Sequence, residues 1–349
     1  MKNYSLNVVP HLLDLDPDEA GLDPGYVSSR YGISPKKVIV LSRNENPFGP
    51  TPRVAKALKS VALNRYPNSK EFIETISQYT EYPVNNILVG SGLDDVITNV
   101  ASLFMSSGDK SLIPIPTYSL YAGVVELNAA IPIYLHGPLS TAVDSEMLEK
   151  AKMVFLCSPN NPTGAVIPER TIRMAVERTE GIVFLDEAYV EFAESSLIKL
   201  VREYENLIVG RTLSKAFGLA GLRLGYAVAP DWIVEKYRRI SPLFGVSSLS
   251  LAAGVAALGD LDYMRSSVAR IISERNRLLN KIKDANPSQA NFLFIQTEEK
   301  SSRVVEKLLY QGIIVRDCSS ILGSGEHYIR VTVGTPEEND RFLESFVQF

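Results

Sequence analysis

One lysine of this sequence has neighbours that would suit it to covalent chemistry. Lys215 lies in the segment 211–226, which reads RTLSKAFGLAGLRLGY, after the hydroxyls of Thr212 and Ser214 and before a run rich in glycine and alanine. Small neighbours would leave its amine partly desolvated, and desolvation lowers the pKa of an ammonium group. A neutral amine can condense with an aldehyde. The segment alone also fits an ordinary solvated lysine behind a helix-capping hydroxyl.

The same segment carries groups that suit a phosphate. Arg223 follows Lys215 by eight residues, and the hydroxyls of Thr212 and Ser214 precede it. A guanidinium fork and hydroxyl donors together can bind a phosphate. A lysine that binds an aldehyde, placed beside a phosphate cradle, is the minimum equipment for pyridoxal 5'-phosphate (PLP).

A second candidate phosphate site follows the apolar run 87–89, which predicts a buried strand. The run leads into GSGLDD at 90–95 and then into a helical pattern. Free backbone N–H groups at a helix start attract anions. The amides around Gly92, Leu93 and Asp94 are therefore candidate phosphate ligands, with a tight turn that binds nothing as the alternative. The dinucleotide fingerprint G-x-G-x-x-G is incomplete here, because an aspartate takes the place of the third glycine.

An acid and two ring-oxygen partners are also available. Asp186 ends the apolar run 182–185, and Tyr189 comes three residues later. A carboxylate in a low-dielectric site would keep a pyridine nitrogen protonated, and the protonated ring is the electron sink of PLP chemistry. Tyr189 and Asn161, which stands in the turn PNNPTG at 159–164, could bond to the ring oxygen. A helix N-cap is the alternative interpretation of Asp186.

Two loops complete the set of candidate residues. Tyr118 follows the predicted strand 111–116, and its aromatic face could cover the ring. The loop 43–50, RNENPFGP, is dense in side-chain amides and predicts a polar site, in which Asn46 is a candidate substrate ligand. Turn formation is the other reason for asparagine in such a loop.

Composition and charge exclude several classes of protein. The 349 residues suffice for two domains or one large α/β unit, and the net charge of −4 argues against nucleic acid or an anionic membrane as the main partner. Cys157 and Cys318 lie far apart and fit no metal spacing, so we expect no metal and a reduced, cytoplasmic compartment. No signal peptide is evident, and no stretch approaches the roughly 18 apolar residues of a membrane span.

The elements that position these residues alternate along the chain. Strands alternating with helices indicate a largely parallel sheet, and polar groups just past the strand ends would share one crevice. Predicted strands are 38–41, 87–89, 111–116, 131–135, 153–158, 182–185, 208–209, 226–228, 292–295, 313–315 and 328–333. Predicted helices include 51–64, 69–81, 96–105, 231–241 and 247–285, the last with a break near 259–260.

The motifs resemble a known family. PNNPTG, DEAY, SKAFGLAGLRLGY and IRVTVGT occur in this order, and together they resemble the class I/II, fold-type I, PLP-dependent aminotransferases over about residues 38–349. The resemblance implies an α/β protein with a three-layer α/β/α large domain, whose sheet is mixed and mostly parallel, and a smaller α+β domain. We expect the large PLP-binding domain at 38–230 and the small domain at 1–37 and 231–349.

The resemblance also implies a role for each candidate residue. Lys215 would bind the cofactor aldehyde and move the substrate proton, and Arg330 would clamp a substrate carboxylate with its bidentate fork. Tyr66, in RYP, would reach the phosphate of the neighbouring subunit, so a homodimer is implied. The other implied cofactor ligands are Gly92, Leu93, Asp94, Tyr118, Asn161, Asp186, Tyr189, Thr212, Ser214 and Arg223.

Within the family, the sequence is similar to the histidinol-phosphate aminotransferases. NENPFGP, RYP, PTY, SQANFLF and the pair Arg316 and Arg330 carry this similarity. It implies transfer of an amino group from histidinol phosphate to 2-oxoglutarate in histidine biosynthesis, giving imidazole acetol phosphate and glutamate. Arg316 would meet the substrate phosphate, unless it forms a structural salt bridge. In place of the usual PY-x-PG the chain reads GLDPG, with Leu22 at the tyrosine position, and Arg43 before NENP is unusual.

These departures leave other activities open. A changed specificity could favour an aromatic amino acid as the amino donor. A PLP decarboxylase of the threonine-phosphate type shares the fold and most motifs, and it would release CO2 without an amino acceptor. A regulator built on the same fold would carry a DNA-binding module or lack Lys215, and an NAD-dependent enzyme would need the complete glycine fingerprint.

Overall fold

The computed structural model describes residues 8–12, 21–137 and 145–346. The N-terminal arm predicted within residues 1–37 therefore lies partly outside the described residues. Among the residues described, no helix is long and apolar enough to cross a membrane.

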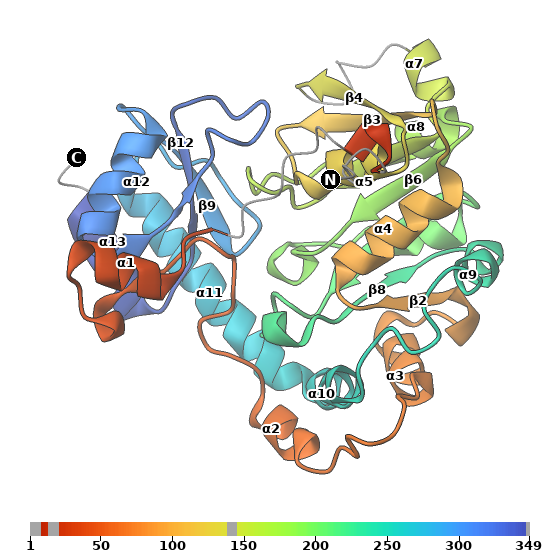
Figure 1. The fold of residues 1–349 in the computed structure, drawn as a ribbon, viewed down its shortest axis with the longest axis horizontal. Helices are drawn as coiled ribbons and strands as arrows, with labels where there is room; N and C mark the ends of the chain where they lie inside the picture. Colours follow the sequence, from red (N-terminus) through yellow and green to blue (C-terminus); the bar gives the residue numbers. More distant parts are fainter. Residues whose placement is uncertain (1–7, 13–20, 138–144, 347–349) are drawn as a thin grey trace, which may run out of the picture.

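A seven-stranded mixed sheet forms the centre of the larger part of the molecule (Figure 1). Its strand order is β2-β8-β7-β6-β5-β3-β4, in which β8 runs antiparallel to both neighbours and the other pairs are parallel. The strands are β2 (Ile87–Gly90), β3 (Lys110–Ile115), β4 (Ile131–His136), β5 (Met153–Cys157), β6 (Ile182–Asp186), β7 (Leu207–Thr212) and β8 (Gly225–Val228). The central strands β5, β6 and β7 are buried at every position, as parallel strands covered on both faces should be.

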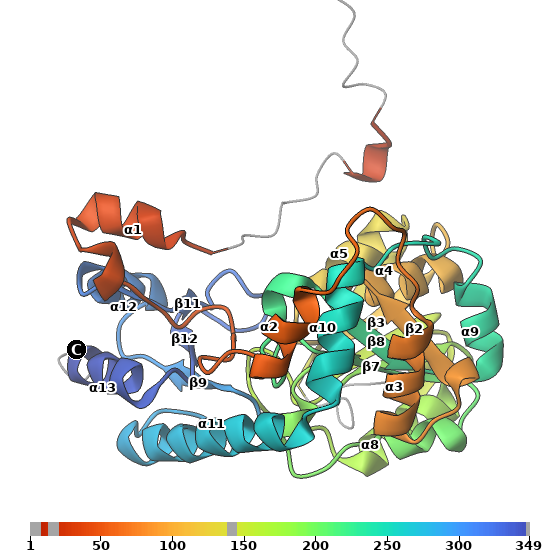
Figure 2. The same ribbon diagram turned by 90° about the horizontal axis from the view of Figure 1, so that it is seen from below.

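Helices cover both faces of this sheet. Figure 2 shows α4 (Leu93–Phe104) and α5 (Leu120–Leu127) on one side and α8 (Glu169–Arg178) on the other. Alternate residues of the strands divide between two apolar cores: Phe155 and Phe184 face α4 and α5, whereas Leu156 and Leu185 join the core on the α8 side. The predicted three-layer α/β/α arrangement with a mixed, mostly parallel sheet is confirmed. The remaining helices around the sheet are α2 (Pro52–Leu58), α3 (Lys70–Thr80), α7 (Ser145–Glu149), α9 (Asp231–Tyr237) and α10 (Ser248–Leu258).

A smaller antiparallel sheet, of order β11-β12-β9, forms the second part of the molecule. The long helix α11 (Leu261–Lys281) leads into it from α10, and the break between α10 and α11 falls at Gly259 and Asp260, as predicted. The other elements of this second part are β9 (Phe292–Gln296), α12 (Ser301–Tyr310), β10 (Ile313–Ile314), β11 (Arg316–Asp317), β12 (Tyr328–Thr332) and α13 (Pro336–Phe346).

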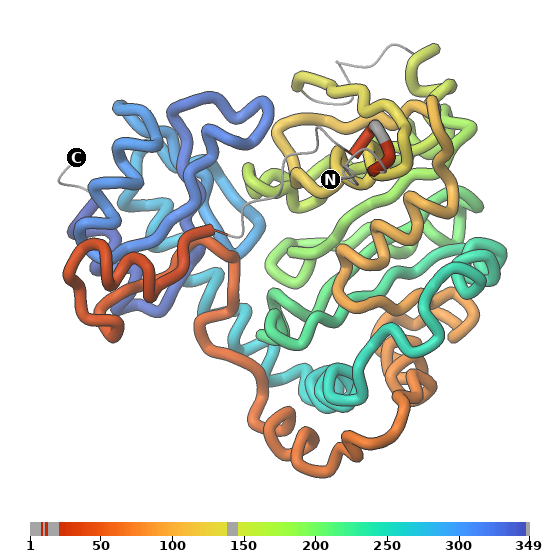
Figure 3. Tube along the Cα trace, viewed as in Figure 1, coloured from red at the N-terminus to blue at the C-terminus, as the bar shows by residue number. Residues whose placement is uncertain are grey.

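The N-terminal segment packs on this smaller part. Figure 3 shows the red segment at residues 24–40 beside the blue C-terminal region, whereas residues 10–12 lie on the larger part against α5. Strand β1 (Ile39–Val40) pairs in parallel with β10, and Val27 of α1 (Pro24–Tyr31) forms a small core with Leu309 and Ile314. Division of the chain into domains at residue 230 stays a prediction. Short 3-10 helices lie at Pro10–Leu12, Pro35–Lys37, Val84–Asn86, Val190–Phe192, Ile198–Arg202 and Ala220–Leu222.

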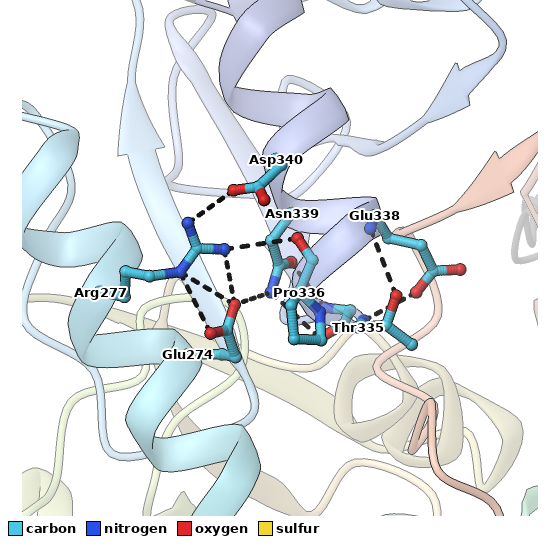
Figure 4. Close-up of polar contacts among 8 residues, drawn as sticks. Glu274, Arg277, Thr335, Pro336, Glu338, Asn339 and Asp340 are labelled. Carbon is cyan, nitrogen blue, oxygen red and sulfur yellow. Dashed lines mark hydrogen bonds and ion pairs between the residues drawn. The ribbon is translucent and has the colours of Figure 1, made fainter.

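A polar network fastens α13 to α11 (Figure 4). Arg277 of α11 donates to Glu274 at 2.7 Å and to Asp340 of α13 at 2.6 Å. Asn339 is fully buried; its amide donates to Glu274 at 2.9 Å and to the Gly334 carbonyl at 3.0 Å, and it accepts from the Gly334 amide at 2.9 Å. Asn339 therefore satisfies the backbone of the turn that joins β12 to α13.

Replacing Asn339 by alanine should destabilise the fold. Asn339→Ala leaves a buried N–H and a buried C=O of Gly334 without their partner, which we expect to cost about 2–4 kcal/mol in the free energy of unfolding. Asp340→Ala is the matched control, because Asp340 is 55% exposed and its ion pair should contribute less than about 1 kcal/mol. Urea unfolding of both variants measures the difference, and equal losses would contradict the role given to Asn339.

Candidate active site

A cavity of about 370 Å³ opens where the central strands end. Open α/β sheets bind ligands beyond the carboxyl ends of their strands, and this cavity lies beyond β5, β6 and β7. The smaller sheet closes it from the other side with Arg316 and Arg330. Of the predicted site residues, those that line it are Leu93, Asp94, Tyr118, Asn161, Asp186, Tyr189, Thr212, Ser214, Lys215, Arg223, Arg316 and Arg330.

Lys215 lies in the turn that follows β7. The turn is fixed by Thr212, whose hydroxyl accepts a hydrogen bond from the Ser214 amide at 3.1 Å. The Lys215 amine donates to the Arg43 carbonyl at 3.2 Å and lies 5.8 Å from the centre of the Tyr189 ring. Burial, and then the positive charge of Arg330, lower the pKa of Lys215 to about 8. A large share of the amine is therefore neutral, and so nucleophilic, at mildly alkaline pH.

Asp186 ends β6 inside the protein and has no cation beside it. One carboxylate oxygen accepts from the Tyr121 hydroxyl at 2.6 Å, and the other accepts from the Ala188 amide at 2.8 Å. Burial raises the pKa of Asp186 to about 6, although both hydrogen bonds oppose that shift. Within the described residues no lysine, arginine or histidine forms an ion pair with it. A buried carboxylate that lacks a protein cation is suited to receive one from a ligand.

The Arg223 side of the cavity has the chemistry of an anion site. The hydroxyl of Ser214 is buried and has no hydrogen-bond partner among the described residues. Arg223 donates to Asp94 at 2.6 Å but stays about half exposed, so its other N–H groups remain available. Leu93 begins α4, whose free amides add to the positive potential. At Gly92, φ is +91°, a backbone conformation that favours glycine, and the Arg223 guanidinium lies next to the position that a Cβ would take.

A chain of hydrogen bonds joins the larger part to the smaller sheet across the cavity. Arg330 donates to the Asn161 side-chain oxygen at 2.5 Å and to the Ser42 carbonyl at 2.6 Å. Asn44 donates to the Tyr189 hydroxyl at 3.0 Å. The amide nitrogen of Asn161 and the hydroxyl proton of Tyr189 are then left to act as donors into the cavity. Both residues line the cavity, and their role as partners of a ring oxygen stays a prediction.

Two arginines face each other on the smaller sheet. Arg316 and Arg330 are opposite residues of β11 and β12. Burial, and among the charges Arg316, lower the pKa of Arg330, so two cations are held close together at a cost. An anionic ligand between or beside them would relieve that cost.

Three predicted ligands do not line the cavity. Gly92 lies behind Arg223, as described above. Asn46 is buried, and its amide donates to the Ala216 carbonyl and to the Ser267 hydroxyl, both at 2.9 Å. Tyr66 is 80% exposed and stacks on Phe244, with ring centres 4.5 Å apart. The substrate role of Asn46 and the cofactor role of Tyr66 stay predictions.

Sequence reasoning missed several residues of the site. Tyr121, which holds Asp186, lies three residues after Tyr118 in the same PTYSLY segment and lacked a distinguishing pattern. Asn44 and Asn46 are both asparagines of the same loop, and the sequence does not distinguish which of them faces the cavity. The further lining residues are Gly21, Ser42, Arg43, Asn44, Thr117, Ser119, Cys157, Ala188 and Ile321.

A buried ion pair supports the site from behind. Arg211 of β7 donates twice to Glu187, at 2.9 and 3.0 Å, and also to Ser196 at 2.6 Å. Both partners are less than a tenth exposed. Glu187 directly follows Asp186, and Arg211 comes four residues before Lys215. The pair therefore fixes the spacing of the two strand ends that carry those residues.

Fold and cavity together define an α/β enzyme that can hold a phosphorylated aldehyde on a lysine. The chain belongs to the aminotransferase class I and II family, which it matches over residues 36–346. It is 41% identical to the histidinol-phosphate aminotransferase of Methanosarcina mazei over 347 residues, which cover 96% of this chain and 94% of that one. It is also 41% identical to histidinol-phosphate aminotransferase 1 of Archaeoglobus fulgidus over 318 residues, or 88% and 98% of the two chains.

A solved structure has the same fold. The histidinol-phosphate aminotransferase of Sinorhizobium meliloti, solved in complex with pyridoxal-5'-phosphate, superposes with a TM-score of 0.85 at 24% identity, over 97% of this chain and 96% of that one. PLP is the cofactor of class I and II aminotransferases. The cavity fits it: the unpartnered Ser214 hydroxyl suits the phosphate, the uncompensated Asp186 suits the ring nitrogen, and Lys215 suits the aldehyde. Across the described chain, no three His, Cys, Asp or Glu side chains gather as metal ligands would.

Asp186→Asn should stabilise the cofactor-free protein at alkaline pH. The pKa of Asp186 rises from 3.8 to about 6 on folding, so the folded state holds the proton more tightly and stability is lost as the pH rises through this interval. Asparagine carries no charge, and we expect a gain on the order of 1–3 kcal/mol at pH 8 that disappears below about pH 4. Urea unfolding across this pH range measures it.

Asp262→Asn is the control for this experiment. Asp262 is 96% exposed, so the same chemical change there should leave the free energy of unfolding unchanged at either pH. A destabilised Asp186→Asn protein at pH 8 would mean that the buried charge is compensated after all.

Proposed function

We propose that this chain transfers an amino group from histidinol phosphate to 2-oxoglutarate and gives imidazole acetol phosphate and glutamate. The observation that carries the proposal is the pair Arg316 and Arg330, which line the cavity together with Lys215 and suit substrates with strongly anionic groups. The name shared by the relatives at 41% identity supports the same substrate. As a step in amino-acid biosynthesis, we place the reaction in the cytoplasm.

Bound PLP supplies an electron sink for the pair of electrons left when the substrate Cα–H bond breaks. Asp186 would keep the ring nitrogen protonated, because a buried carboxylate stabilises an adjacent cation. Tyr121 and the Ala188 amide keep that carboxylate in place. Tyr118 would cover one face of the ring; its hydroxyl donates to Asp94 at 3.2 Å, which fixes the side chain.

Lys215 would hold the cofactor aldehyde between turnovers and would then move the proton from the substrate Cα. Its lowered pKa, about 8, makes the neutral amine available as a base near physiological pH. Arg330 would bind the carboxylate of glutamate or 2-oxoglutarate with its fork, in competition with Asn161 and the Ser42 carbonyl. Arg316 would bind the phosphate of histidinol phosphate.

The amino donor is tested by a half-reaction with the holoenzyme. We expect histidinol phosphate to discharge the cofactor absorbance well ahead of phenylalanine, tyrosine and threonine phosphate. Lys215→Ala should lower the rate by about 10⁴-fold or more, because it removes both the anchoring amine and the base. Lys199→Ala is the control, since Lys199 is an exposed lysine that pairs with Glu169 and does not line the cavity.

Other outcomes of this half-reaction contradict the proposal. An aromatic amino acid as the fastest donor would move the enzyme to another pathway with the same chemistry. CO2 release from threonine phosphate would make it a decarboxylase. Turnover by Lys215→Ala at the rate of the unaltered enzyme would remove the lysine from the mechanism.

We also propose that the enzyme is a homodimer in which Tyr66 reaches the cofactor phosphate of the partner subunit. Tyr66 is 80% exposed and does not line the cavity of its own chain, so its side chain is accessible to a second chain. Its ring stacks on that of Phe244, and Leu63 and Leu243, which are close to these two residues in the sequence, are 78% and 86% exposed. Exposed apolar side chains gathered in this way are typical of an interface.

Mixed subunits test this arrangement. Tyr66→Ala should bind the cofactor more weakly, and Lys215→Ala should be inactive. In a dimer that carries one variant of each kind, one site has both an intact Tyr66 and an intact Lys215. Co-refolding equal amounts should therefore restore about one quarter of the unaltered activity, as expected for random pairing of a two-fold dimer. A monomer in sedimentation, or a mixture no more active than its parents, would contradict the proposal.

A further inference from the structure

Arg43 lines the cavity although no role has been assigned to it so far. It lies in the loop between β1 and α2, directly before Asn44. Its own carbonyl accepts the hydrogen bond from the Lys215 amine at 3.2 Å, so its backbone adjoins the reacting end of that side chain. A side chain that starts there can reach a substrate without any movement of the fold.

The guanidinium of Arg43 has no carboxylate partner among the residues described. With the residues that the structure describes, its side chain makes one hydrogen bond, a long one of 3.4 Å to the Leu22 carbonyl, and it is exposed. Arg223, by contrast, is paired with Asp94 at 2.6 Å, and Arg211 behind the site is paired with Glu187 at 2.9 Å. Most N–H groups of the Arg43 guanidinium are therefore available to a ligand in the cavity.

The charges that line the cavity point to an anion with more than one negative charge. Five basic side chains face two carboxylates there, and of these carboxylates Asp94 is already paired with Arg223 while Asp186 is buried at the end of β6. Phosphate is such an anion, and the planar fork of arginine matches its oxygens. Leu22, which accepts from Arg43, stands where the sequence led us to expect a phosphate-binding tyrosine.

We infer that Arg43 binds the phosphate of the amino donor, in the place left by the missing tyrosine, and so sets specificity for a phosphorylated substrate. The inference rests on the proposed function, because it needs a donor that carries a phosphate. Arg43 takes no part in the proton transfer; it acts only on the binding of that group.

The test compares a phosphorylated donor with its unphosphorylated form. We expect the kcat/KM of Arg43→Gln holoenzyme for histidinol phosphate to fall by about ten- to one-hundredfold, the equivalent of one charge-assisted hydrogen bond. For histidinol, which lacks the phosphate, kcat/KM should stay within about twofold, as should the half-reaction with glutamate. Arg43→Lys, which keeps the charge but not the fork, should recover part of the loss. Arg303→Gln, an exposed arginine of α12 that does not line the cavity, is the matched control.

Each other outcome has a distinct meaning. Equal losses for histidinol and histidinol phosphate would overturn the inference, because Arg43 would then act on the Lys215 turn rather than on the phosphate. No loss for either donor would overturn it as well, while activity of the unaltered enzyme on histidinol phosphate would leave the proposed function standing. If the unaltered enzyme does not prefer histidinol phosphate to histidinol, the proposed function fails, and this inference fails with it.

Discussion

The ion pair between Arg211 and Glu187 is the interaction on which the geometry of the site depends. The parallel ladder of β6 and β7 sets the register of the two strands, with Asp186 opposite Gly210, and the ion pair adds a side-chain contact at the point where the ladder ends. Here the residue after Asp186 is tied to a residue four before Lys215 on the neighbouring strand. The pair lies on the far side of the reacting groups, so it can be rigid and fully desolvated without occupying space that a ligand needs. Burying these two charges costs desolvation free energy. The pair nevertheless helps to fix the spacing of the two strand ends.

Asp186 and Lys215 in the cavity do not pair with each other, although Arg223 and Asp94 beside them do, whereas Arg211 and Glu187 outside the cavity form a buried ion pair. Within the part of the chain that the structure describes, neither Asp186 nor Lys215 forms an ion pair, and burial pushes each toward its neutral form. Five basic side chains surround a space that suits two separate phosphates, one on the cofactor and one on the proposed substrate. The uncompensated charges lower the stability of the ligand-free protein. A ligand that compensates them removes this cost, and the free energy recovered adds to its binding.

Most of the fold could be predicted from the sequence, because the strands are unbroken apolar runs and the helices have regular apolar spacing. The break at Gly259 was also visible, since glycine followed by aspartate interrupts a helical pattern. Within the site, residues that follow a strand directly, such as Asp186, could be placed because strand ends converge. The loop before α2 could not be resolved, since Asn44 and Asn46 are the same residue type two positions apart. A positive φ of 54° at Asn44 turns this loop, and only the structure reveals which amide faces the cavity.

The low pKa of Lys215 makes it a chemically distinct amine within the chain. At pH 8 about half of it is unprotonated, whereas a solvated lysine with a pKa near 10.4 has less than about one part in a hundred in that form. A reagent that attacks neutral amines will therefore modify Lys215 faster than it modifies the solvated lysines of the protein, as long as the cavity is unoccupied. The same property that suits the residue to its cofactor exposes it to any stray aldehyde, so prompt occupation of the cavity also protects the enzyme.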